Sequence, residues 1–349
     1  FSEARIRSHA KLSYEQVADF LQTPAAPVPG ARSESLQALH AASACLQQQR
    51  QRDHIALPER AEYRARLDDS GKIASYQRQT KNAAHQLVEE CMVATNRCAA
   101  DFLQADGLDN SAVFVTHAGF RSERRDNIDK LIAAELPQLA DGDIANLNDY
   151  VSLMKVVAST ASELPLREIL TRSLERSQFS ATPAPHFGMG LPCYLTVTSP
   201  IRKFNDYLSQ RAIKAKLRGE KRAAIGTETI ARLQDCSDRA RQAANMAQQW
   251  LDCDYLSKQT QATWLGTIVH VTSSGFLVRL NDNGIQGLVD TRRIGEKFSF
   301  DVVYMRLRSA KNTYQLEQQV EVKIAAIDPK KHQIAFALAD TANGSTTDN

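Results

Sequence analysis

The sequence changes character after about Gln261, and this change constrains the fold more than any other feature. From 264 to 338, short runs of alternating or β-branched apolar residues recur. Turn-forming residues separate them, as in Ser273-Ser274-Gly275, Asn281-Asp282-Asn283-Gly284 and Asp328-Pro329-Lys330-Lys331. Short strands at this spacing are typical of a small all-β barrel. We therefore predict an OB-type barrel over 260–340 and a disordered tail over 341–349, which is rich in Ser, Thr, Asn and Gly.

Residues 1–259 are predicted to form a helix-rich body that also contains some sheet. Gly and Pro number only 15 and 11 among 349 residues, which favours helix because both residues weaken it. Apolar residues at helical spacing predict helices from Tyr14 onward with Ser13 as N-cap, and at about 33–52, 80–105, 124–178 with a break near Pro165, 201–217 and 227–256. Strand-like stretches are predicted at 55–73 and 113–115. The predicted fold class is therefore α+β, a helical body followed by a barrel.

Charge is distributed unevenly along the chain. The 43 Lys and Arg residues exceed the 40 Asp and Glu residues only slightly, for a net charge of +3. Between Ile201 and Arg222, however, eight basic residues accompany two acidic ones, a local net charge of +6. The positive electrostatic potential of such a cluster favours binding of a polyanion. A solvated helix face is an equally good interpretation of a basic run taken alone.

Two further features exclude other classes of protein. No apolar run approaches the roughly 20 residues that a membrane-spanning helix needs, so we expect no membrane association. The six cysteines are widely spaced and form no CxxC pair, so the sequence predicts no zinc site. A reducing, cytoplasmic setting is the expectation that follows.

The segment with the most specific chemistry is Thr198-Ser199-Pro200-Ile201-Arg202-Lys203-Phe204. It places two hydroxyls and a proline at a predicted helix start, with Arg202 and Lys203 in the first turn. Helix N-termini bind phosphates readily, and cations there oppose the helix dipole unless an anion lies between them. An arginine can also hold a phosphate by two parallel hydrogen bonds. The segment predicts a phosphate site, and the alternative is a capped helix with exposed cations.

Several motifs together resemble the ribonuclease II/ribonuclease R family of exoribonucleases. The main signature is His186-Phe187-Gly188-Met189-Gly190-Leu191, with Tyr194 and the run from Thr198 to Asp206. Ile6 to Tyr14, and Leu87 to Met92 with Ala94 and Asn96, agree in order. The barrel resembles the S1-like RNA-binding domain that ends these enzymes, through Gly266-x-x-Val269, Ser274 to Val278 and Gly284 to Val289.

The resemblance implies processive 3′→5′ hydrolysis of single-stranded RNA to nucleoside 5′-monophosphates, with a divalent metal at the active site. Arg202 matches the family's active-site arginine, which lies against the scissile phosphate and would neutralise its growing charge. Ser199 and Lys203 would hold neighbouring phosphates. The expected partner is single-stranded RNA, and DNA is not an expected substrate.

The resemblance also assigns three RNA contacts outside this segment. Tyr14 matches an aromatic residue near the terminal nucleotide, although it could instead face the core. Glu89 matches an acid that contacts RNA sugars, but His85 is a competing partner, and Glu90 would act if the register shifts by one. Phe276 is a candidate stacking residue of the barrel, unless its strand turns it into the core.

The chain departs from the family in two ways. Leu57 stands where the family commonly has an aromatic residue that clamps bases. The family's aspartate cluster, which holds Mg²⁺, lies upstream of every motif aligned here, so we expect no metal ligands in this chain. Asp141, Asp143 and Asp149 are interpreted as a polar loop. The alternative function is an inactive family member that binds single-stranded RNA as a regulatory module.

His186 is a further candidate, because histidine is the usual general base near neutral pH. A metal-assisted hydrolysis does not require such a base, and a Pro-His-Phe-Gly loop more often packs structurally. His117 and Arg121 follow a predicted buried strand, and a structural role is expected for them too.

Overall fold

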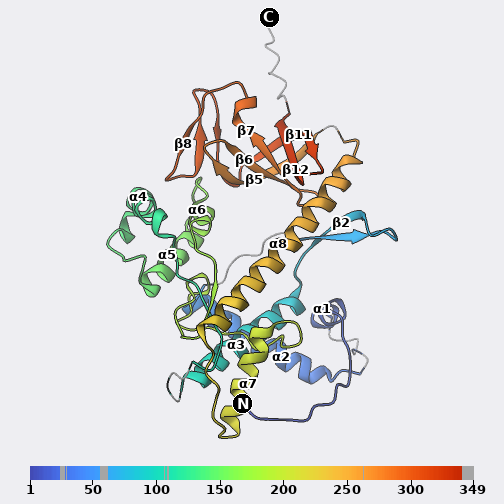
Figure 1. Ribbon diagram of the computed structural model, residues 1–349, viewed down its shortest axis with the longest axis vertical. Coiled ribbons are helices and arrows are strands. Elements are labelled where there is room, and N and C mark those ends of the chain that lie inside the picture. The colour runs from blue at the N-terminus through green and yellow to red at the C-terminus, as the bar shows by residue number, and fades with distance from the viewer. Residues whose placement is uncertain are drawn as a thin grey trace, which may run out of the picture.

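The computed structural model describes residues 1–23, 28, 30–55, 62–105, 107, 110–261 and 263–339. A helical body lies at one end of the molecule and a β-barrel at the other, and one long helix joins them (Figure 1). Leu57 and the tail predicted over 341–349 lie outside the described residues. The α+β fold class is confirmed.

The helices largely follow the apolar periodicity of the sequence. They are α1 (Tyr14–Gln22), α2 (Ser33–Asp53), α3 (Ala83–Gln104), α4 (Arg125–Glu135), α5 (Leu147–Ser159), α6 (Leu166–Arg172), α7 (Phe204–Leu217) and α8 (Thr227–Ser257). Ser13 caps α1 as expected, in a capping box with Gln16. Asn82 caps α3 by accepting the N–H groups of Ala84 and His85.

The prediction of helix over 124–178 is confirmed in part: the stretch forms α4, α5 and α6, but a loop separates α4 from α5 and no helix continues beyond Arg172. After α4, Pro137 starts a short 3-10 turn, and a loop follows until Asn146 caps α5. Pro165 is the N-cap of α6, so the expected break there is confirmed. Beyond α6, the strand β4 (Gln178–Ser180) pairs with β3 (Phe114–Thr116). Capping residues and prolines therefore divide this apolar stretch into separate helices.

The barrel forms as predicted from the spacing of its strands. In the order β11-β12-β7-β6-β5 it closes on itself. Its strands are β5 (Trp264–Thr272), β6 (Gly275–Leu280), β7 (Gln286–Asp290), β11 (Gln319–Asp328) and β12 (Gln333–Leu338). A side sheet of β8 (Ser299–Asp301), β9 (Arg306–Arg308) and β10 (Thr313–Tyr314) lies between β7 and β11 in the chain.

Within the stretch predicted as strand over 55–73, the described residues from Glu62 onward form the first strand and the turn of a hairpin. Strand β1 (Glu62–Leu67) pairs antiparallel with β2 (Ile73–Gln79) across a turn in which Asp68 accepts the N–H groups of Ser70 and Lys72. The hairpin reaches both α8 and the barrel. Tyr76 hydrogen-bonds Asp252 of α8, and the Tyr63 hydroxyl donates to the carbonyl of Asn281 at 2.6 Å.

The assignment of Phe276 to RNA stacking is wrong, and the core alternative is confirmed. Its side chain is 1% exposed, and its ring stacks on that of Tyr314 of β10 within the apolar core, with centroids 4.7 Å apart. Side chains alternate across a strand, so Leu277 and Arg279 of β6 face outward instead.

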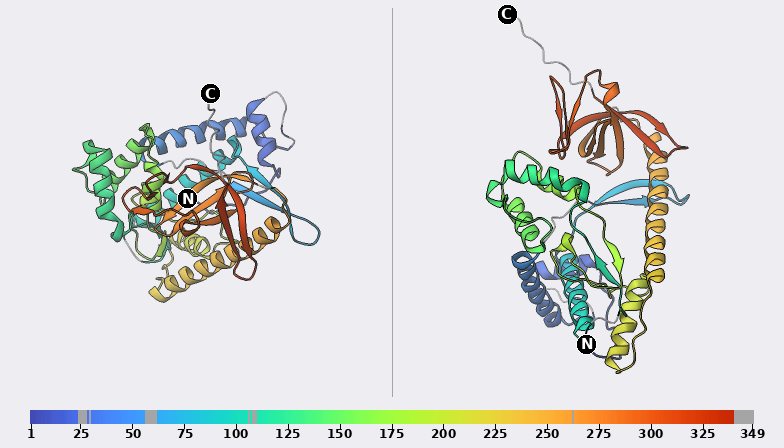
Figure 2. Two further views of the ribbon diagram at one scale, coloured as in Figure 1. Left: turned by 90° about the horizontal axis from the view of Figure 1, so that it is seen from above. Right: turned by 60° about the vertical axis from the view of Figure 1, so that its left-hand side comes forward.

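Two polar contacts attach the turn between β8 and β9 of the side sheet to the body. The Tyr304 hydroxyl donates to Glu135 at 2.7 Å, and Arg124 donates to the carbonyl of Val302 at 3.0 Å. One apolar core continues from α4–α6 into the barrel. On the other side, α8 runs between body and barrel (Figure 2). No helix in the described part of the chain is long and apolar enough to cross a membrane.

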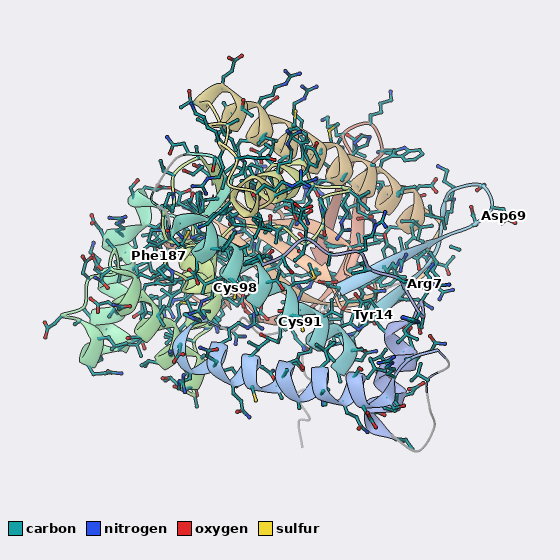
Figure 3. All side chains as sticks on the ribbon, turned by 90° about the horizontal axis from the view of Figure 1, so that it is seen from below. Arg7, Tyr14, Asp69, Cys91, Cys98 and Phe187 are labelled. Atoms are coloured by element: carbon teal, nitrogen blue, oxygen red, sulfur yellow. The ribbon has the colours of Figure 1, made fainter. Side chains whose placement is uncertain are left out.

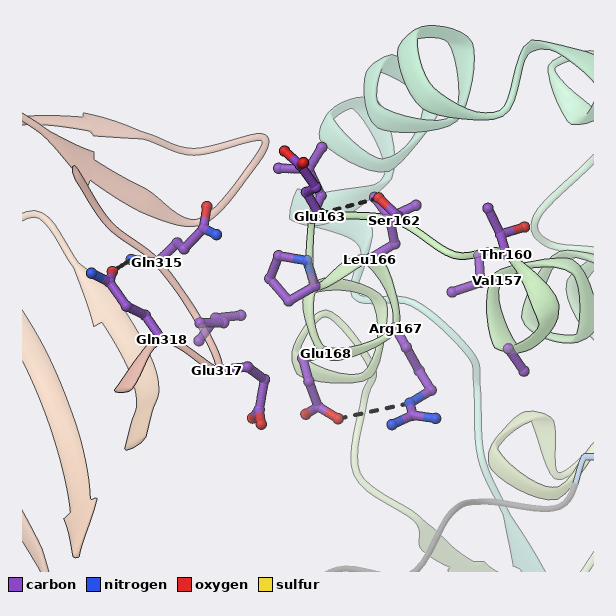
Figure 4. Close-up of a pocket in the computed structure, with 14 residues that line it drawn as sticks. Val157, Thr160, Ser162, Glu163, Leu166, Arg167, Glu168, Gln315, Glu317 and Gln318 are labelled. Carbon is purple, nitrogen blue, oxygen red and sulfur yellow. Dashed lines mark hydrogen bonds and ion pairs between the residues drawn. The ribbon is translucent and has the colours of Figure 1, made fainter. Parts of the chain in front are cut away.

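A cleft of about 440 Å³ separates the α5–α6 connection from the barrel turn at 315–318 (Figure 4). Glu163, Glu168 and Glu317 line it, together with Arg167. Its excess of carboxylates disfavours a phosphate backbone. The cleft is therefore a poor site for a nucleic acid.

A substitution at Gly275 tests the pairing of β6 with β7. A Cβ at this position would lie 2.2 Å from the carbonyl oxygen of Val289, which is backbone and cannot move aside. We expect Gly275→Ser to lower the free energy of unfolding by about 1–3 kcal/mol through overpacking. Gly226→Ser is the matched control: that residue is the N-cap of α8 with open space around it, and serine is a good N-cap. Urea unfolding followed by circular dichroism measures both, and unchanged stability of Gly275→Ser would contradict the pairing.

Candidate nucleic-acid interface

A fully buried carboxylate holds the loop that carries the predicted phosphate site. Asp206, in the first turn of α7, is 0% exposed. It accepts hydrogen bonds from the N–H of Ser199 at 2.8 Å, from Asn205 Nδ2 at 2.8 Å and from the Thr196 hydroxyl. A buried carboxylate is stable only when its oxygens are paired in this way. Sequence analysis included Asp206 in the motif but gave it no role.

A second buried residue ties the same loop to α3. Asn96 is 3% exposed; its Oδ1 accepts the N–H of Val197 at 2.9 Å, and its Nδ2 donates to the Tyr194 hydroxyl at 2.8 Å. Gln210 of α7 donates to the carbonyl of Val197 at 2.7 Å. The loop is therefore fixed from both sides, by α3 and by α7.

The prediction that Arg202 and Lys203 lie in the first turn of a helix is wrong. The helix begins at Phe204, and Lys203 is its N-cap without a side-chain cap. The two residues belong to a turn in which the Ser199 carbonyl accepts the N–H of Arg202 at 3.2 Å and of Lys203 at 3.0 Å. The helix starts later because Asp206, a favourable residue in a first turn, pairs back to Ser199.

Both cations are nevertheless available to an anion. Arg202 and Lys203 are exposed, and no hydrogen bond or ion pair holds either side chain among the described residues. Ser199 is half-buried, and its backbone N–H and carbonyl are already used within the loop. Two unpaired cations on a rigid turn are a suitable phosphate site.

An exposed aromatic pair continues this surface along α7, and sequence analysis missed it. Phe204 is 57% exposed and Tyr207 41% exposed, and their rings stack with centroids 5.7 Å apart. The guanidinium of Arg211 lies 5.9 Å from the Tyr207 ring. The signal was available, since residues at i, i+3 and i+7 share one helix face. Exposed rings beside cations provide a stacking surface for bases.

A second cluster forms where α1 meets α3. Tyr14 is 43% exposed, and its ring stacks on His85 with centroids 3.9 Å apart, so the core-facing alternative for Tyr14 is wrong. Figure 3 views this side of the molecule and labels Tyr14, Arg7 of the N-terminal segment and Cys91 of α3. The structure thus leaves part of the Tyr14 ring free for a base.

Glu89 belongs to the same cluster, but His85 is not its partner. Glu89 pairs with Lys81 at 2.7 Å and with Arg50 at 3.4 Å, whereas the ring of His85 contacts Asn82 and Tyr14. Burial raises the pKa of Glu89, but the two cations outweigh it and hold the pKa below its usual value. The carboxylate is charged and remains partly exposed.

The neighbouring acid has a different environment. Glu90 is 2% exposed and hydrogen-bonds Arg50 within the fold. Of the two candidate acids, Glu89 is therefore the one that a ribose hydroxyl can reach. Glu89 and Asn96 lie two turns apart on α3, about 10 Å along its axis, so one helix positions both clusters.

His186 and His117 pack inside the body. Their rings lie 5.4 Å apart, and His186 also packs edge-on against Tyr194. Burial and the neighbouring His117 lower the pKa of His186 to about 4. A buried, neutral histidine that contacts other rings has the structural role that the sequence favoured.

Two of the three acids in the 141–149 loop, Asp143 and Asp149, hydrogen-bond within the loop itself. Asp149 accepts the N–H of Asp143 at 3.0 Å, and Asp143 accepts the N–H of Ala145 at 2.8 Å. In the ranges that the structure describes, no three His, Cys, Asp or Glu side chains are grouped to hold a metal ion. The acids of this loop do not converge on one point and so do not fit a Mg²⁺ site.

Comparison with known proteins places this geometry in a family. Residues 1–219 match the RNB domain, and residues 259–338 match the S1 RNA binding domain. The chain therefore belongs to the RNB family of exoribonucleases. Among curated relatives, ribonuclease R of Escherichia coli (strain K12) is 30% identical over 361 residues, covering 97% of this chain and 44% of that protein.

Solved structures share the fold. Mycoplasma genitalium RNase R in complex with ribose-methylated single-stranded RNA gives a TM-score of 0.76 at 21% identity, over 93% of this chain and 53% of that one. Yeast Ssd1, described as a pseudonuclease, gives 0.56 at 19% identity, over 85% and 37%. The chain spans about half the length of the curated relatives it matches. Because a pseudonuclease shares the fold, the fold alone does not establish hydrolysis.

Glu89→Ala should narrow the difference between RNA and DNA binding. The variant removes a charged acceptor that this cluster offers to a ribose 2′-OH, and hydrogen bonds to charged groups contribute about 1.5–3 kcal/mol. We expect the RNA-to-DNA affinity ratio to fall at least about fivefold. Competition between matched RNA and DNA oligomers measures it, with Glu228→Ala on α8 as the exposed control. An unchanged ratio would exclude a sugar-reading role.

His186 predicts how stability depends on pH. Its pKa is about 4 in the folded chain and about 6.5 when unfolded, so between these values the unfolded chain binds more protons. The free energy of unfolding should therefore fall as the pH decreases from about 6.5 toward 4. His186→Gln should flatten this slope, even if it lowers stability at every pH. Thermal unfolding from pH 4.5 to 7.5 measures both proteins, and parallel slopes would refute the assignment.

Proposed function

We propose that the whole protein is an exoribonuclease that degrades single-stranded RNA processively, from 3′ to 5′, to nucleoside 5′-monophosphates. The observation that carries this proposal is a turn with two exposed, unpaired cations, Arg202 and Lys203. Asp206 and Asn96 hold this turn in place by accepting backbone N–H groups of the loop before it. Membership of the RNB family and the S1 RNA binding domain support it.

Each residue of the surface has a role in this proposal. Arg202 neutralises the negative charge that grows on the phosphoryl oxygens, while Lys203 holds a neighbouring phosphate with Ser199. Tyr14 stacks on a base near the 3′ end. Glu89 accepts a hydrogen bond from a ribose 2′-OH, which only RNA supplies.

The proposal includes dependence on a divalent cation such as Mg²⁺. Such an ion supplies a nucleophilic water and stabilises charge on the phosphoryl group when it is bound. The described residues of this chain do not group ligands for it. In this proposal Arg202, Lys203, Tyr14 and Glu89 bind and orient the RNA. Substituting one of these residues and removing the metal are separate experiments, so the two contributions to catalysis can be measured independently.

Arg202→Ala in the whole protein tests the proposal. We expect kcat to fall at least about a hundredfold while the Kd for RNA changes less than about threefold, because the arginine acts on charge that develops in the transition state. Release of mononucleotides from 5′-labelled RNA should stop when EDTA removes the metal and resume when Mg²⁺ is added. Arg232→Ala, an exposed arginine on α8, is the control and should behave as wild type.

Two results would contradict the proposal in different ways. A loss of affinity with unchanged kcat would make Arg202 a tether for RNA rather than a catalytic residue. Failure of the wild-type protein to release mononucleotides with Mg²⁺ or Mn²⁺, while it still binds RNA, would identify it as an RNA-binding member of the family that has lost hydrolysis.

A further inference from the structure

Part of α8 stands clear of both the body and the barrel. Residues 239–250 are exposed throughout, and the helix returns to the core only at Cys253 and Leu256, each 1% exposed. In the right-hand view of Figure 2, α8 runs along one edge of the molecule between body and barrel. A helix segment that packs against so little of its own chain is normally polar on all sides.

This exposed segment instead carries an apolar face. Its members recur at intervals of three and four residues: Ala240, Ala243, Ala244, Met246, Ala247 and Trp250. With about 3.6 residues per turn, they cover an arc of about 160°, and no polar residue between Ala240 and Trp250 falls within it. Met246 is 49% and Trp250 44% exposed. Large apolar side chains gathered on an exposed face mark an interaction surface.

The apolar face points away from the barrel. On the barrel side of α8, polar residues of the helix line a groove: Asn245, Gln248, Gln249 and Asp252. At about 100° per residue, these four lie on the opposite side of α8 from the apolar face. The tip of the β1–β2 hairpin reaches the C-terminal end of the face, where Lys72 Nζ lies 4.0 Å from the centroid of the Trp250 ring. From Ala240 to Ala247, no other described residue covers the face, since every residue there is exposed.

The sizes of its side chains make the apolar face complementary to itself. Its N-terminal half has alanines, and its C-terminal half has the large side chains of Met246 and Trp250. In an antiparallel pair of α8 helices, one register places Trp250 opposite Ala240 of the second copy. The same register, centred on residue 245, places Met246 opposite Ala244 and Ala243 opposite Ala247. Each large side chain then packs against a small one, whereas a parallel pair would place large against large.

The charges at the two ends of the face favour the same direction. Arg239 and Arg241 lie at its N-terminal end, and Asp252 and Asp254 at its C-terminal end. An antiparallel pair brings the arginines of one copy to the carboxylates of the other, while a parallel pair brings like charges together. The arginines now form exposed ion pairs within α8, such as Arg241 with Asp238 at 3.2 Å. Exposed pairs of this kind contribute little free energy, so they can rearrange on association.

We propose that the apolar face of α8 pairs antiparallel with the same face of a second copy of this chain, in a dimer with two-fold symmetry. Because the pair is antiparallel, the barrel of each copy lies at the end of α8 where the other copy has its body. A contact about 15 Å long buries less surface than the interfaces of stable complexes do. The dimer is therefore weak and forms at micromolar concentrations. The proposal does not rest on the proposed function.

Sedimentation velocity of the full 349-residue chain tests the proposal. Between about 1 and about 100 µM, the mean mass should rise from that of one chain toward that of two. Ala243→Glu/Ala247→Glu should weaken association at least about tenfold, because four carboxylates would meet at the centre of the contact. Glutamate is a good helix former, so circular dichroism should not change. Asn245→Glu/Gln249→Glu, with the same charges at the same spacing on the barrel side of α8, is the matched control and should associate as wild type.

Tryptophan fluorescence provides a second measurement on the same samples. The chain has two tryptophans, and Trp264 is only 5% exposed in the single chain. A blue shift of the emission with rising concentration therefore reports burial of Trp250. This shift should be present in the wild-type chain and in the matched control, and absent from Ala243→Glu/Ala247→Glu.

Cross-linking with a short bismaleimide, followed by peptide mapping, determines the direction of the pair. A thiol introduced by Ala244→Cys lies near the two-fold axis and should cross-link to its counterpart in the second copy. The exposed native Cys236 should not, because its two copies are about 27 Å apart along the helices in the proposed register. A cross-link between the two Cys236 thiols would overturn the antiparallel arrangement. A chain that stays monomeric at every concentration, or a dimer that Ala243→Glu/Ala247→Glu leaves intact, would overturn the proposal as a whole.

Discussion

The buried carboxylate of Asp206 is the interaction on which the candidate site depends. An ion taken out of water costs several kcal/mol unless hydrogen bonds replace its hydration, and here Thr196, Ser199 and Asn205 replace it. Two of these donors lie in the loop before α7. The carboxylate can therefore stay buried only while that loop keeps its conformation, so Arg202 and Lys203 are presented at defined positions although they are exposed.

Helix α3 joins this loop to the rest of the RNA surface. It carries Glu89 and the ring partner of Tyr14 in its first half, and Asn96, which holds Val197, two turns later. The ion pair of Arg50 with the buried Glu90 ties α2 to the same helix. Breaking a buried pair by removing one partner is strongly destabilising, so α2 and α3 are held in a fixed relation beneath the candidate site.

Periodicity and spacing predicted the elements better than their ends or faces. The barrel and α3 were predictable because their apolar patterns are regular over many residues. The start of α7 was not, because Lys203 carries no capping signal and the boundary depends on Asp206, three residues later. Alternation alone placed Phe276 and Leu277 on opposite faces, but only closure of the barrel shows that Phe276 faces inward. The partners of Glu89 come from α2 and from Lys81, before α3, and no local pattern reveals them.

Helix α8 determines how far the barrel lies from the turn that carries Arg202 and Lys203. A straight helix of 31 residues is about 46 Å long, so under the proposed function the cationic turn and the barrel would contact distant parts of one RNA strand. The hairpin β1–β2 contacts both α8, through Tyr76 and Asp252, and the barrel, through Tyr63 and the carbonyl of Asn281. These contacts hold α8 and the barrel in a defined relation, so the separation is a property of the fold and does not depend on a bound ligand.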